Sequence, residues 1–123
     1  MDIKALFKIS YGLYVVSANE NGKDNGCIIN TFSQVTDTPL RVSVTVNKLN
    51  LTHDMIKNTG NFVVSVLSTS APFSAFQNFG FRSGKDADKF EGVRTRRCEN
   101  GVLRLDENTN AFVSGKVVEE VDL

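Results

Sequence analysis

The segment from Leu40 to Asn47 alternates strictly between apolar and polar residues, and this pattern limits the possible folds more than any other feature. Leucine or valine stands at every even position from 40 to 46, and a polar residue stands at every odd position from 41 to 47. A period of two is typical of a β-strand with one face on a hydrophobic core and the other in solvent. The pattern therefore predicts a sheet with one covered face.

Other short apolar segments, separated by turn residues, extend this prediction along the chain. Turn-forming residues dominate 19–26 and 36–39, which predicts a hairpin and a tight connection. The segment 61–68 is apolar on both faces, which is typical of a central strand. Strands are thus predicted at 13–18, 27–35, 40–47, 61–68 and 111–121, the last with a bulge at Gly115.

Only brief helices are expected, at 2–9, 50–58 and 70–80. Asn50 is suited to cap the second helix and Gly60 to end it. Four phenylalanines between positions 73 and 81 indicate a packed aromatic corner, and the polar segment 82–92 indicates a surface excursion. Together the elements predict a mainly β fold, an antiparallel sheet closed into a small barrel. No glycine-rich motif for a Rossmann unit or a P-loop is present.

Composition and charge exclude several classes of protein. The 123 residues suit one domain spanning 1–123, and 14 basic residues balance 14 acidic ones, which argues against nucleic-acid binding. No apolar run is long enough for a membrane span, and the first ten residues lack the layout of a signal peptide, so we expect a cytoplasmic protein. Arg94, Arg96 and Arg97 form the one basic cluster, either a solvated face or a patch for a phosphorylated ligand.

The residues that usually carry catalysis or metal binding are scarce. Cys27 and Cys98 are far apart, and His53 is the only histidine, so we expect two free thiols and no zinc or iron–sulfur site. No serine–histidine–aspartate trio or carboxylate pair can be singled out. If the protein is an enzyme, a bound cofactor supplies its chemistry.

Small polar donors gather where the alternating strand meets the second predicted helix. Asn47, Lys48, Asn50, Thr52 and His53 lie before or within the first helical turn. One interpretation is an ordinary capped helix with solvated side chains. The other is an anion site, because a helix start offers unpaired N–H groups and the positive end of the dipole.

A second polar group lies in the segment 29–34, INTFSQ. Asn30, Thr31, Ser33 and Gln34 place polar side chains on both faces of a predicted strand, which is costly unless they find partners. They are either a strand edge near solvent with paired hydroxyls, or a wall that meets a flat, hydrogen-bonding ring.

Three blocks of the sequence together resemble a known family. They are FKISYGLYVVSA, NTFSQVTDTPLRVSVTVNKLNLTHDMIKNTGNFVVSVLS and FGFRSGKDADKFEGV, which occur in this order within residues 5–93. The blocks are similar to the flavin reductase-like family, and most of all to archaeal ferric reductase and flavoredoxin-type proteins. The resemblance implies an FMN-binding split barrel with six strands in Greek-key order, usually a homodimer with FMN near the subunit interface.

The resemblance also implies an activity and roles for individual residues. Such proteins take hydride from NADH or NADPH onto the flavin and pass electrons to free flavin, ferric iron or a redox protein. The implied contacts with the flavin ring and ribityl chain are Asn30, Thr31, Ser33 and Gln34. The implied contacts with the ribityl chain and phosphate are Asn47, Lys48, Thr52 and His53. The implied cover over the cofactor is Phe81, Arg82 and Ser83, with Arg82 near the phosphate.

One departure from the family pattern concerns the end of the chain. Family members continue after a strand such as 111–121 with a turn and another strand containing a histidine, whereas this chain ends at Leu123. We therefore expect a chain truncated at its C-terminus, or one whose gap another chain fills, with weaker flavin binding and impaired hydride transfer. The alternatives to a reductase are an FMN-binding electron carrier that works beside a protein such as rubredoxin, and an inactive dimer with an empty pocket.

Overall fold

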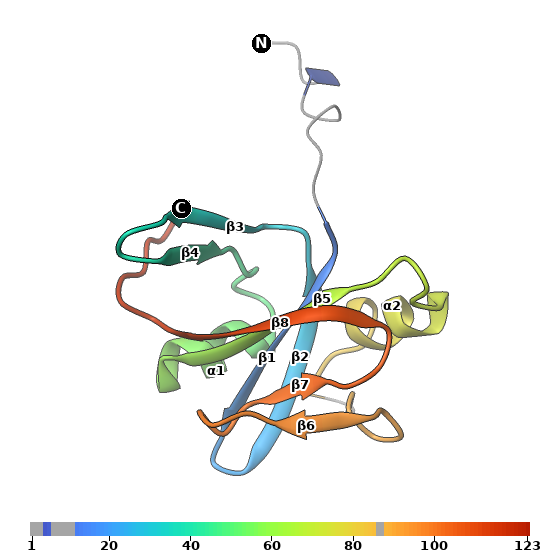
Figure 1. Cartoon of the computed structure of the whole chain (residues 1–123). Coiled ribbons are helices and arrows are strands. Elements are labelled where there is room, and N and C mark those ends of the chain that lie inside the picture. Colours follow the sequence, from blue (N-terminus) through green and yellow to red (C-terminus); the bar gives the residue numbers. More distant parts are fainter. Residues whose placement is uncertain (1–3, 6–11, 86–87) are drawn as a thin grey trace.

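A computed structural model describes residues 4–5, 12–85 and 88–123 (Figure 1). These residues form a mainly β fold with antiparallel sheets and two short helices, as the sequence predicts. Most of the predicted helix at 2–9 lies outside the described residues. The elements are β1 (Tyr14–Glu20), β2 (Lys23–Ile29), β3 (Phe32–Thr36), β4 (Arg41–Val44), α1 (Leu51–Thr59), β5 (Asn61–Leu67), α2 (Phe73–Gly80), β6 (Thr95–Arg97), β7 (Leu103–Leu105) and β8 (Thr109–Lys116).

The largest sheet has four antiparallel strands in the order β2-β1-β5-β8. Its first hairpin is tighter than the turn predicted at 19–26, because β1 and β2 stay paired as far as Glu20 and Lys23. Only Asn21 and Gly22 connect them, both with positive φ (52° and 83°), which is the backbone that a two-residue hairpin turn requires. The central position predicted for 61–68 is confirmed, since β5 lies between β1 and β8.

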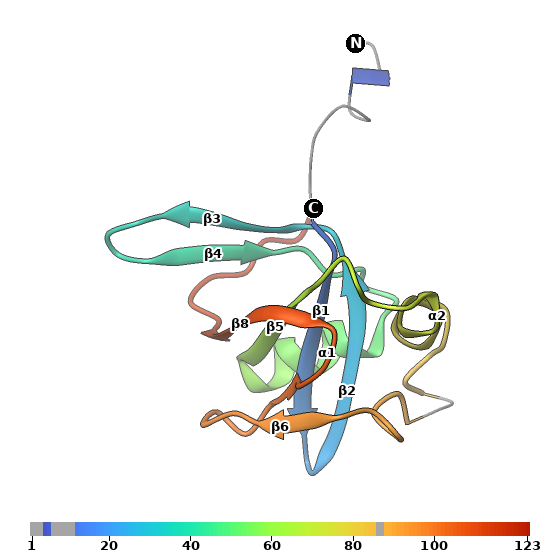
Figure 2. The same ribbon diagram turned by 45° about the vertical axis from the view of Figure 1, so that its right-hand side comes forward.

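The strand predicted at 27–35 is wrong as a single element. β2 ends at Ile29, and β3 begins at Phe32 in a separate sheet, where it pairs with β4. The exposed residues Asn30 and Thr31 separate the two strands, which allows the chain to change direction. Figure 2 shows the β3–β4 hairpin extending away from the four-stranded sheet.

The alternating segment follows its predicted pattern from Val42 to Val46, but Leu40 is exposed and the strand is shorter than predicted, from Arg41 to Val44. Val42, Val44 and Val46 are half-buried, and the polar residues between them are exposed.

The bulge predicted at Gly115, in the edge strand β8 of the large sheet, is wrong. Gly115 pairs regularly with Phe62, and the register of the β5–β8 pairing shifts instead between Val66 and Leu67.

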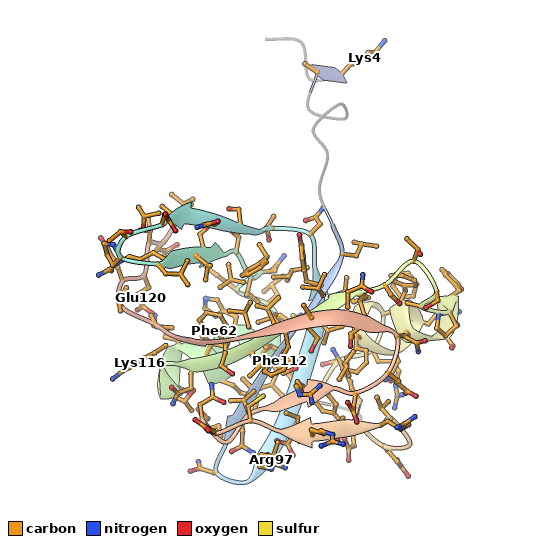
Figure 3. All side chains as sticks on the ribbon, in the orientation of Figure 1. Lys4, Phe62, Arg97, Phe112, Lys116 and Glu120 are labelled. Carbon is orange, nitrogen blue, oxygen red and sulfur yellow. The ribbon has the colours of Figure 1, made fainter. Side chains whose placement is uncertain are left out.

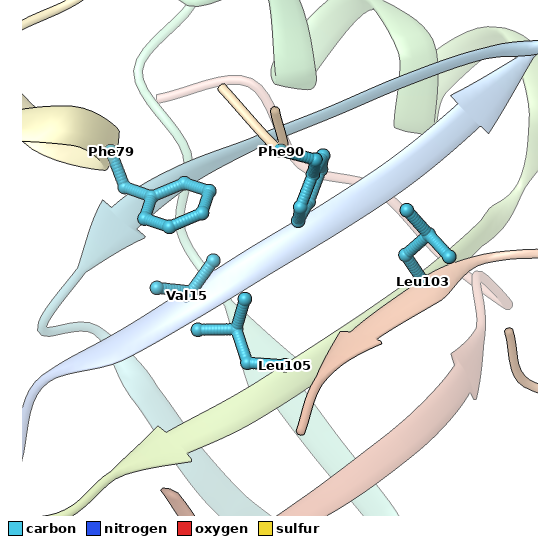
Figure 4. Packing of buried hydrophobic residues seen from close by; sticks show 5 residues of the cluster. All are labelled: Val15, Phe79, Phe90, Leu103 and Leu105. Atoms are coloured by element: carbon cyan, nitrogen blue, oxygen red, sulfur yellow. The ribbon is translucent and has the colours of Figure 1, made fainter. Parts of the chain in front are cut away.

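Both faces of the large sheet are covered. Neighbouring residues of β1 point to opposite sides of the sheet, and each side carries its own hydrophobic cluster. Val15 belongs to a cluster completed by Phe79, Phe90, Leu103 and Leu105 (Figure 4). Val16 belongs to a second cluster on the other side, with Cys27, Ile29, Phe62 and Val64. The first cluster brings α2 and β7 to one face, and the second brings α1 and the β3–β4 hairpin to the other.

Helix α1 begins and ends where its sequence predicts. The Asn50 side chain accepts a hydrogen bond from the Thr52 N–H at 3.0 Å, and Gly60 closes the helix in the left-handed conformation. Helix α2 begins at Phe73, three residues after the predicted start, with Pro72 before its first turn. The predicted aromatic corner is only partly correct, since Phe79 is buried whereas Phe73 and Phe81 are mostly exposed.

Two of the three clustered arginines, Arg96 and Arg97, pair with nearby acids. Arg97, labelled in Figure 3 near the β1–β2 turn, donates to both carboxylate oxygens of Asp24 at 2.9 and 3.1 Å. Arg96 donates to Asp106 at 3.0 Å. Burial acts to raise the pKa of Asp24, but hydrogen bonds from Arg97 and Asn19 outweigh it, so this pKa lies below its ordinary value.

The Arg97→Met variant is expected to lower the free energy of unfolding by about 1 kcal/mol at neutral pH, because the pair is two-pronged but partly exposed. A carboxyl group whose pKa is lowered by folding stabilises the protein above its unfolded pKa and loses this effect as the pH falls through the folded value. The difference in the free energy of unfolding between the variant and the wild type should therefore shrink below about pH 4. Urea unfolding from pH 7 to pH 2 measures it, with Arg41→Met as the control; a difference that persists at the lowest pH contradicts the assignment.

Candidate functional site

A cavity of about 350 Å³ opens between the start of α1 and the turn that follows α2. This volume lies within the usual range for small-molecule sites. The cavity combines two segments that are about thirty residues apart in the sequence. We call it the α1–α2 cavity; its lining residues are Asn47, Leu49, Asn50, Leu51, Gly80, Phe81, Arg82, Ser83, Gly84 and Lys89.

The charge of the α1–α2 cavity favours an anion. Arg82 and Lys89 are its charged lining residues, and no carboxylate is found among the lining residues that the structure describes. The start of α1 adds the positive end of a nine-residue helix. Asn47 and Asn50 use their side-chain oxygens to accept from the N–H groups of Leu49 and Thr52, at 2.8 and 3.0 Å. The predicted cap at Asn50 is thus confirmed, and it leaves the side-chain amide groups of both asparagines available as donors.

The turn after α2 is tied to its surroundings at several points. Arg82 donates to the Asn78 side-chain oxygen at 2.6 Å, and Asn78 donates to the backbone oxygen of Lys89. The Ser83 hydroxyl accepts from the Lys85 N–H at 3.1 Å. Lys23, from β2, donates to the Gly84 carbonyl at 2.9 Å. These bonds hold Arg82 and Ser83 at the edge of the cavity.

Lys89 is the functional candidate that the sequence did not indicate. The segment 82–92 was predicted as a surface excursion, yet the Lys89 residue is only 2% exposed. Its ammonium group donates to the carbonyls of Gly26 at 2.9 Å and Phe79 at 3.3 Å. Burial lowers the pKa of Lys89, which is the expected direction for a cation removed from water. The prediction of a surface position is therefore wrong for Lys89, because these two backbone carbonyls compensate the cost of burying its charge.

Thr52 lies beneath the α1–α2 cavity rather than in its lining. It is fully buried, and its hydroxyl accepts from the Asn25 side chain at 2.9 Å. The side-chain oxygen of Asn25 is buried and has no hydrogen-bond partner among the described residues. Burial raises the pKa of the neighbouring Cys27 thiol, which stays neutral and unsuited to act as a nucleophile. A role for Thr52 in contacting a ligand stays a prediction.

Lys48 and His53, the two predicted basic residues at the start of α1, are not part of the cavity lining. Lys48 forms an exposed ion pair with Asp122 near the end of the chain. The His53 ring nitrogen Nδ1 lies 3.0 Å from an Asp54 carboxylate oxygen, and the histidine is partly buried. Neither side chain lines the cavity.

The predicted ring-facing residues lie along β3 and the link before it, away from the α1–α2 cavity lining. Thr31 donates to the Thr45 carbonyl at 2.8 Å, and the hydroxyls of Ser33 and Ser43 pair across β3 and β4 at 3.1 Å. Gln34 donates to the Thr36 carbonyl at 3.3 Å, and Asn30 is exposed. Of the predicted contact residues, the structure brings together in the cavity Asn47, Phe81, Arg82 and Ser83.

The described residues offer neither a metal site nor a membrane-spanning helix. Within residues 4–5, 12–85 and 88–123, no group of three histidine, cysteine or acidic residues could hold a metal ion. Neither helix of this part of the chain has the length and hydrophobicity needed to cross a membrane.

Comparisons with known proteins agree on one family. The model of the flavin reductase like domain matches residues 6–123. The chain is 41% identical to a ferric-chelate reductase (NAD(P)H) of Archaeoglobus fulgidus over all 123 of its residues, which span 73% of that relative. It is 39% identical to a high molecular weight rubredoxin of Moorella thermoacetica over 122 residues, which span 53% of that relative.

Solved structures show the same fold at lower identity. Flavoredoxin from Methanosarcina acetivorans superposes with a TM-score of 0.82 at 23% identity, over 92% of this chain and 60% of that one. The flavin reductase HpaC complexed with NADP+ superposes with a TM-score of 0.80 at 21% identity, over 98% of this chain and 74% of that one. The split-barrel fold predicted from the resemblance is confirmed.

Proposed function

The chain belongs to the flavin reductase-like family, and on this basis we propose that it binds FMN and carries electrons from NADH or NADPH through the flavin to an acceptor. The observation that supports this most directly is the α1–α2 cavity, in which Arg82, Lys89 and the start of a helix meet and whose described lining residues include no carboxylate. A phosphate monoester is the part of FMN that such a donor set suits. When bound, the flavin supplies the hydride and electron chemistry.

In this proposal the residues of the chain bind and orient the cofactor. Arg82 and Ser83 hold the phosphate from the turn after α2, and the Asn47 and Asn50 amides hold it from the start of α1. Lys48 and His53 offer N–H donors beside the site, and Thr52 supports the first turn of α1. Asn30, Thr31, Ser33 and Gln34 offer polar groups along β3 to the flavin ring and ribityl chain, and Phe81 offers an apolar cover.

The electron donor, the acceptor and the assembly are parts of the same proposal. The name of the Archaeoglobus relative includes NAD(P)H and a ferric chelate. We propose a comparable cytoplasmic reductase that takes NADH or NADPH, acts as a homodimer and reduces free flavin, ferric iron or a redox protein. Stopped-flow absorbance with each nucleotide, followed by ferric citrate or free FMN, identifies the donor and acceptor.

A second candidate is an FMN-containing electron carrier that works beside a rubredoxin. It is favoured by the 39% identity to a protein named high molecular weight rubredoxin. Anaerobic bleaching of bound flavin by NADH or NADPH at a catalytically useful rate supports the reductase. Bleaching only by a reduced protein partner supports the carrier, and purified protein that never binds FMN supports the inactive dimer.

The Arg82→Met variant tests the phosphate site. We expect its affinity for FMN to fall roughly thirtyfold, since a hydrogen bond to a charged group contributes about 2 kcal/mol. Its affinity for riboflavin, which lacks the phosphate, should stay near the wild-type value. Quenching of flavin fluorescence measures both.

Arg96→Met is the matched control, because it removes an exposed arginine that lies on β6 and pairs with Asp106. Its affinities for both flavins should equal those of the wild type. Equal losses of FMN and riboflavin affinity in Arg82→Met would refute a phosphate contact, and unchanged FMN affinity would place the cofactor elsewhere.

A further inference from the structure

Lys89 joins two elements that are distant in the sequence and adjacent in the fold. Its ammonium group donates to the Gly26 carbonyl of β2 and to the Phe79 carbonyl near the end of α2. A lysine at 2% exposure is costly unless its charge finds such partners, and an apolar side chain of similar length would fill the same space without that cost. The two hydrogen bonds that the ammonium group donates, which an apolar side chain could not make, therefore account for a lysine at position 89.

The same residue is connected to the turn that lines the α1–α2 cavity. Its backbone oxygen accepts from Asn78, whose side-chain oxygen in turn accepts from Arg82. The Phe79 carbonyl accepts from the Lys89 ammonium group, and Phe79 immediately precedes Gly80, the last residue of α2 before the turn. Lys89 thus contacts the end of α2 through its side chain and, through Asn78, the guanidinium that faces the cavity.

We propose that Lys89 is a positioning residue, whose charged side chain fastens the end of α2 to β2 and thereby holds Arg82 and Ser83 at the α1–α2 cavity. This inference rests on the proposed FMN site and adds a residue to it. The titratable groups that face Lys89 are the neutral Cys27 thiol on β2 and the Arg82 guanidinium after α2. Since Lys89 also lines the cavity, direct contact with the anion is the competing explanation, and the experiment is designed to separate the two.

The first test compares Lys89→Met in two backgrounds. In the wild-type background we expect FMN affinity to fall about tenfold, since a misplaced turn loosens both phosphate donors, while riboflavin affinity changes little. In an Arg82→Met/Ser83→Ala background, Lys89→Met should change FMN affinity less than about threefold, because the residues through which it acts are gone. A full tenfold loss in that background would show direct contact and overturn the positioning role.

Lys85→Met is the control, since it removes an exposed lysine from the same segment. It should leave both flavin affinities at their wild-type values. If Lys89→Met does not fold, Lys89→Gln, which keeps N–H donors, is compared in the same way. Reduced but measurable FMN affinity in Lys89→Gln supports the proposal, and wild-type FMN affinity in whichever variant folds overturns it.

The second test needs no cofactor, so it separates this inference from the proposed function. Amide hydrogen exchange is measured on the flavin-free protein for residues 80–85 and, as an internal reference, for β1 and β5. We expect exchange in 80–85 to be at least about tenfold faster in Lys89→Met, with β1 and β5 unchanged. Unchanged exchange at 80–85 overturns the inference even if FMN binds, and faster exchange supports it even if FMN does not bind.

Discussion

Replacing Phe79 with alanine is expected to lower the free energy of unfolding by about 4 kcal/mol, the usual cost of deleting a buried ring. The ring is 2% exposed, contacts Phe90 edge-on at 5.3 Å between centroids, and lies in the cluster that contains Val15 (Figure 4). It is also the buried residue of α2, so its removal leaves this helix without its anchor. Urea unfolding followed by circular dichroism measures the change.

Phe73→Ala on the same helix is the matched control. Phe73 is 65% exposed, so its removal should change stability by less than about 0.5 kcal/mol. A small domain has only about 5–15 kcal/mol of stability, so Phe79→Ala should be close to unfolding at physiological temperature. Equal effects of the two variants would mean that the helix is not anchored through Phe79.

The fold was most predictable where a local pattern determines the outcome. The alternation and the cap and stop at Asn50 and Gly60 depend on residues a few positions apart. The structure confirms the cap, the stop and the alternation from Val42 to Val46, whereas Leu40 is exposed. The continuous strand predicted at 27–35 was wrong because its division at Asn30 depends on which sheet each half joins. Pairing with a distant strand leaves no local signal in such a short segment.

The candidate site shows the same division. The donors at the start of α1 were visible because they are neighbours in the sequence, and the resemblance added Arg82 and Ser83. Lys89 was missed because its acceptors, the carbonyls of Gly26 and Phe79, are backbone atoms of distant elements. In sequence terms, a lysine among Asp88, Asp86 and Lys85 is indistinguishable from a surface residue.

The need for glycine at position 84 also arises from a residue that is distant in the sequence, Asn25. A Cβ atom at this buried position would collide with all three terminal atoms of the Asn25 side chain. Asn25 cannot move aside freely, since it is 1% exposed and donates to Thr52 at 2.9 Å. The turn must therefore shift outward, or Asn25 must give up its hydrogen bond in the interior.

Gly84→Ala is therefore expected to lower the free energy of unfolding by about 2 kcal/mol, the usual cost of overpacking. If the α1–α2 cavity binds FMN, the displaced turn should also weaken that binding about tenfold, because such sites tolerate shifts of only about 0.5 Å. Urea unfolding and flavin fluorescence quenching measure the two effects. Gly80→Ala is the control for stability, since its Cβ would meet Ile28 at an ordinary 3.8 Å.

A double-mutant cycle with Asn25→Ala identifies the collision as the cause. Asn25→Ala alone is destabilising because it removes the partner of the buried Thr52 hydroxyl. It also removes the atoms that the new Cβ would meet, so the double variant should be more stable than the sum of the two single effects predicts. Strict additivity would show that Gly84 is required for a reason other than Asn25, and the packing that we describe between β2 and the turn would then be wrong.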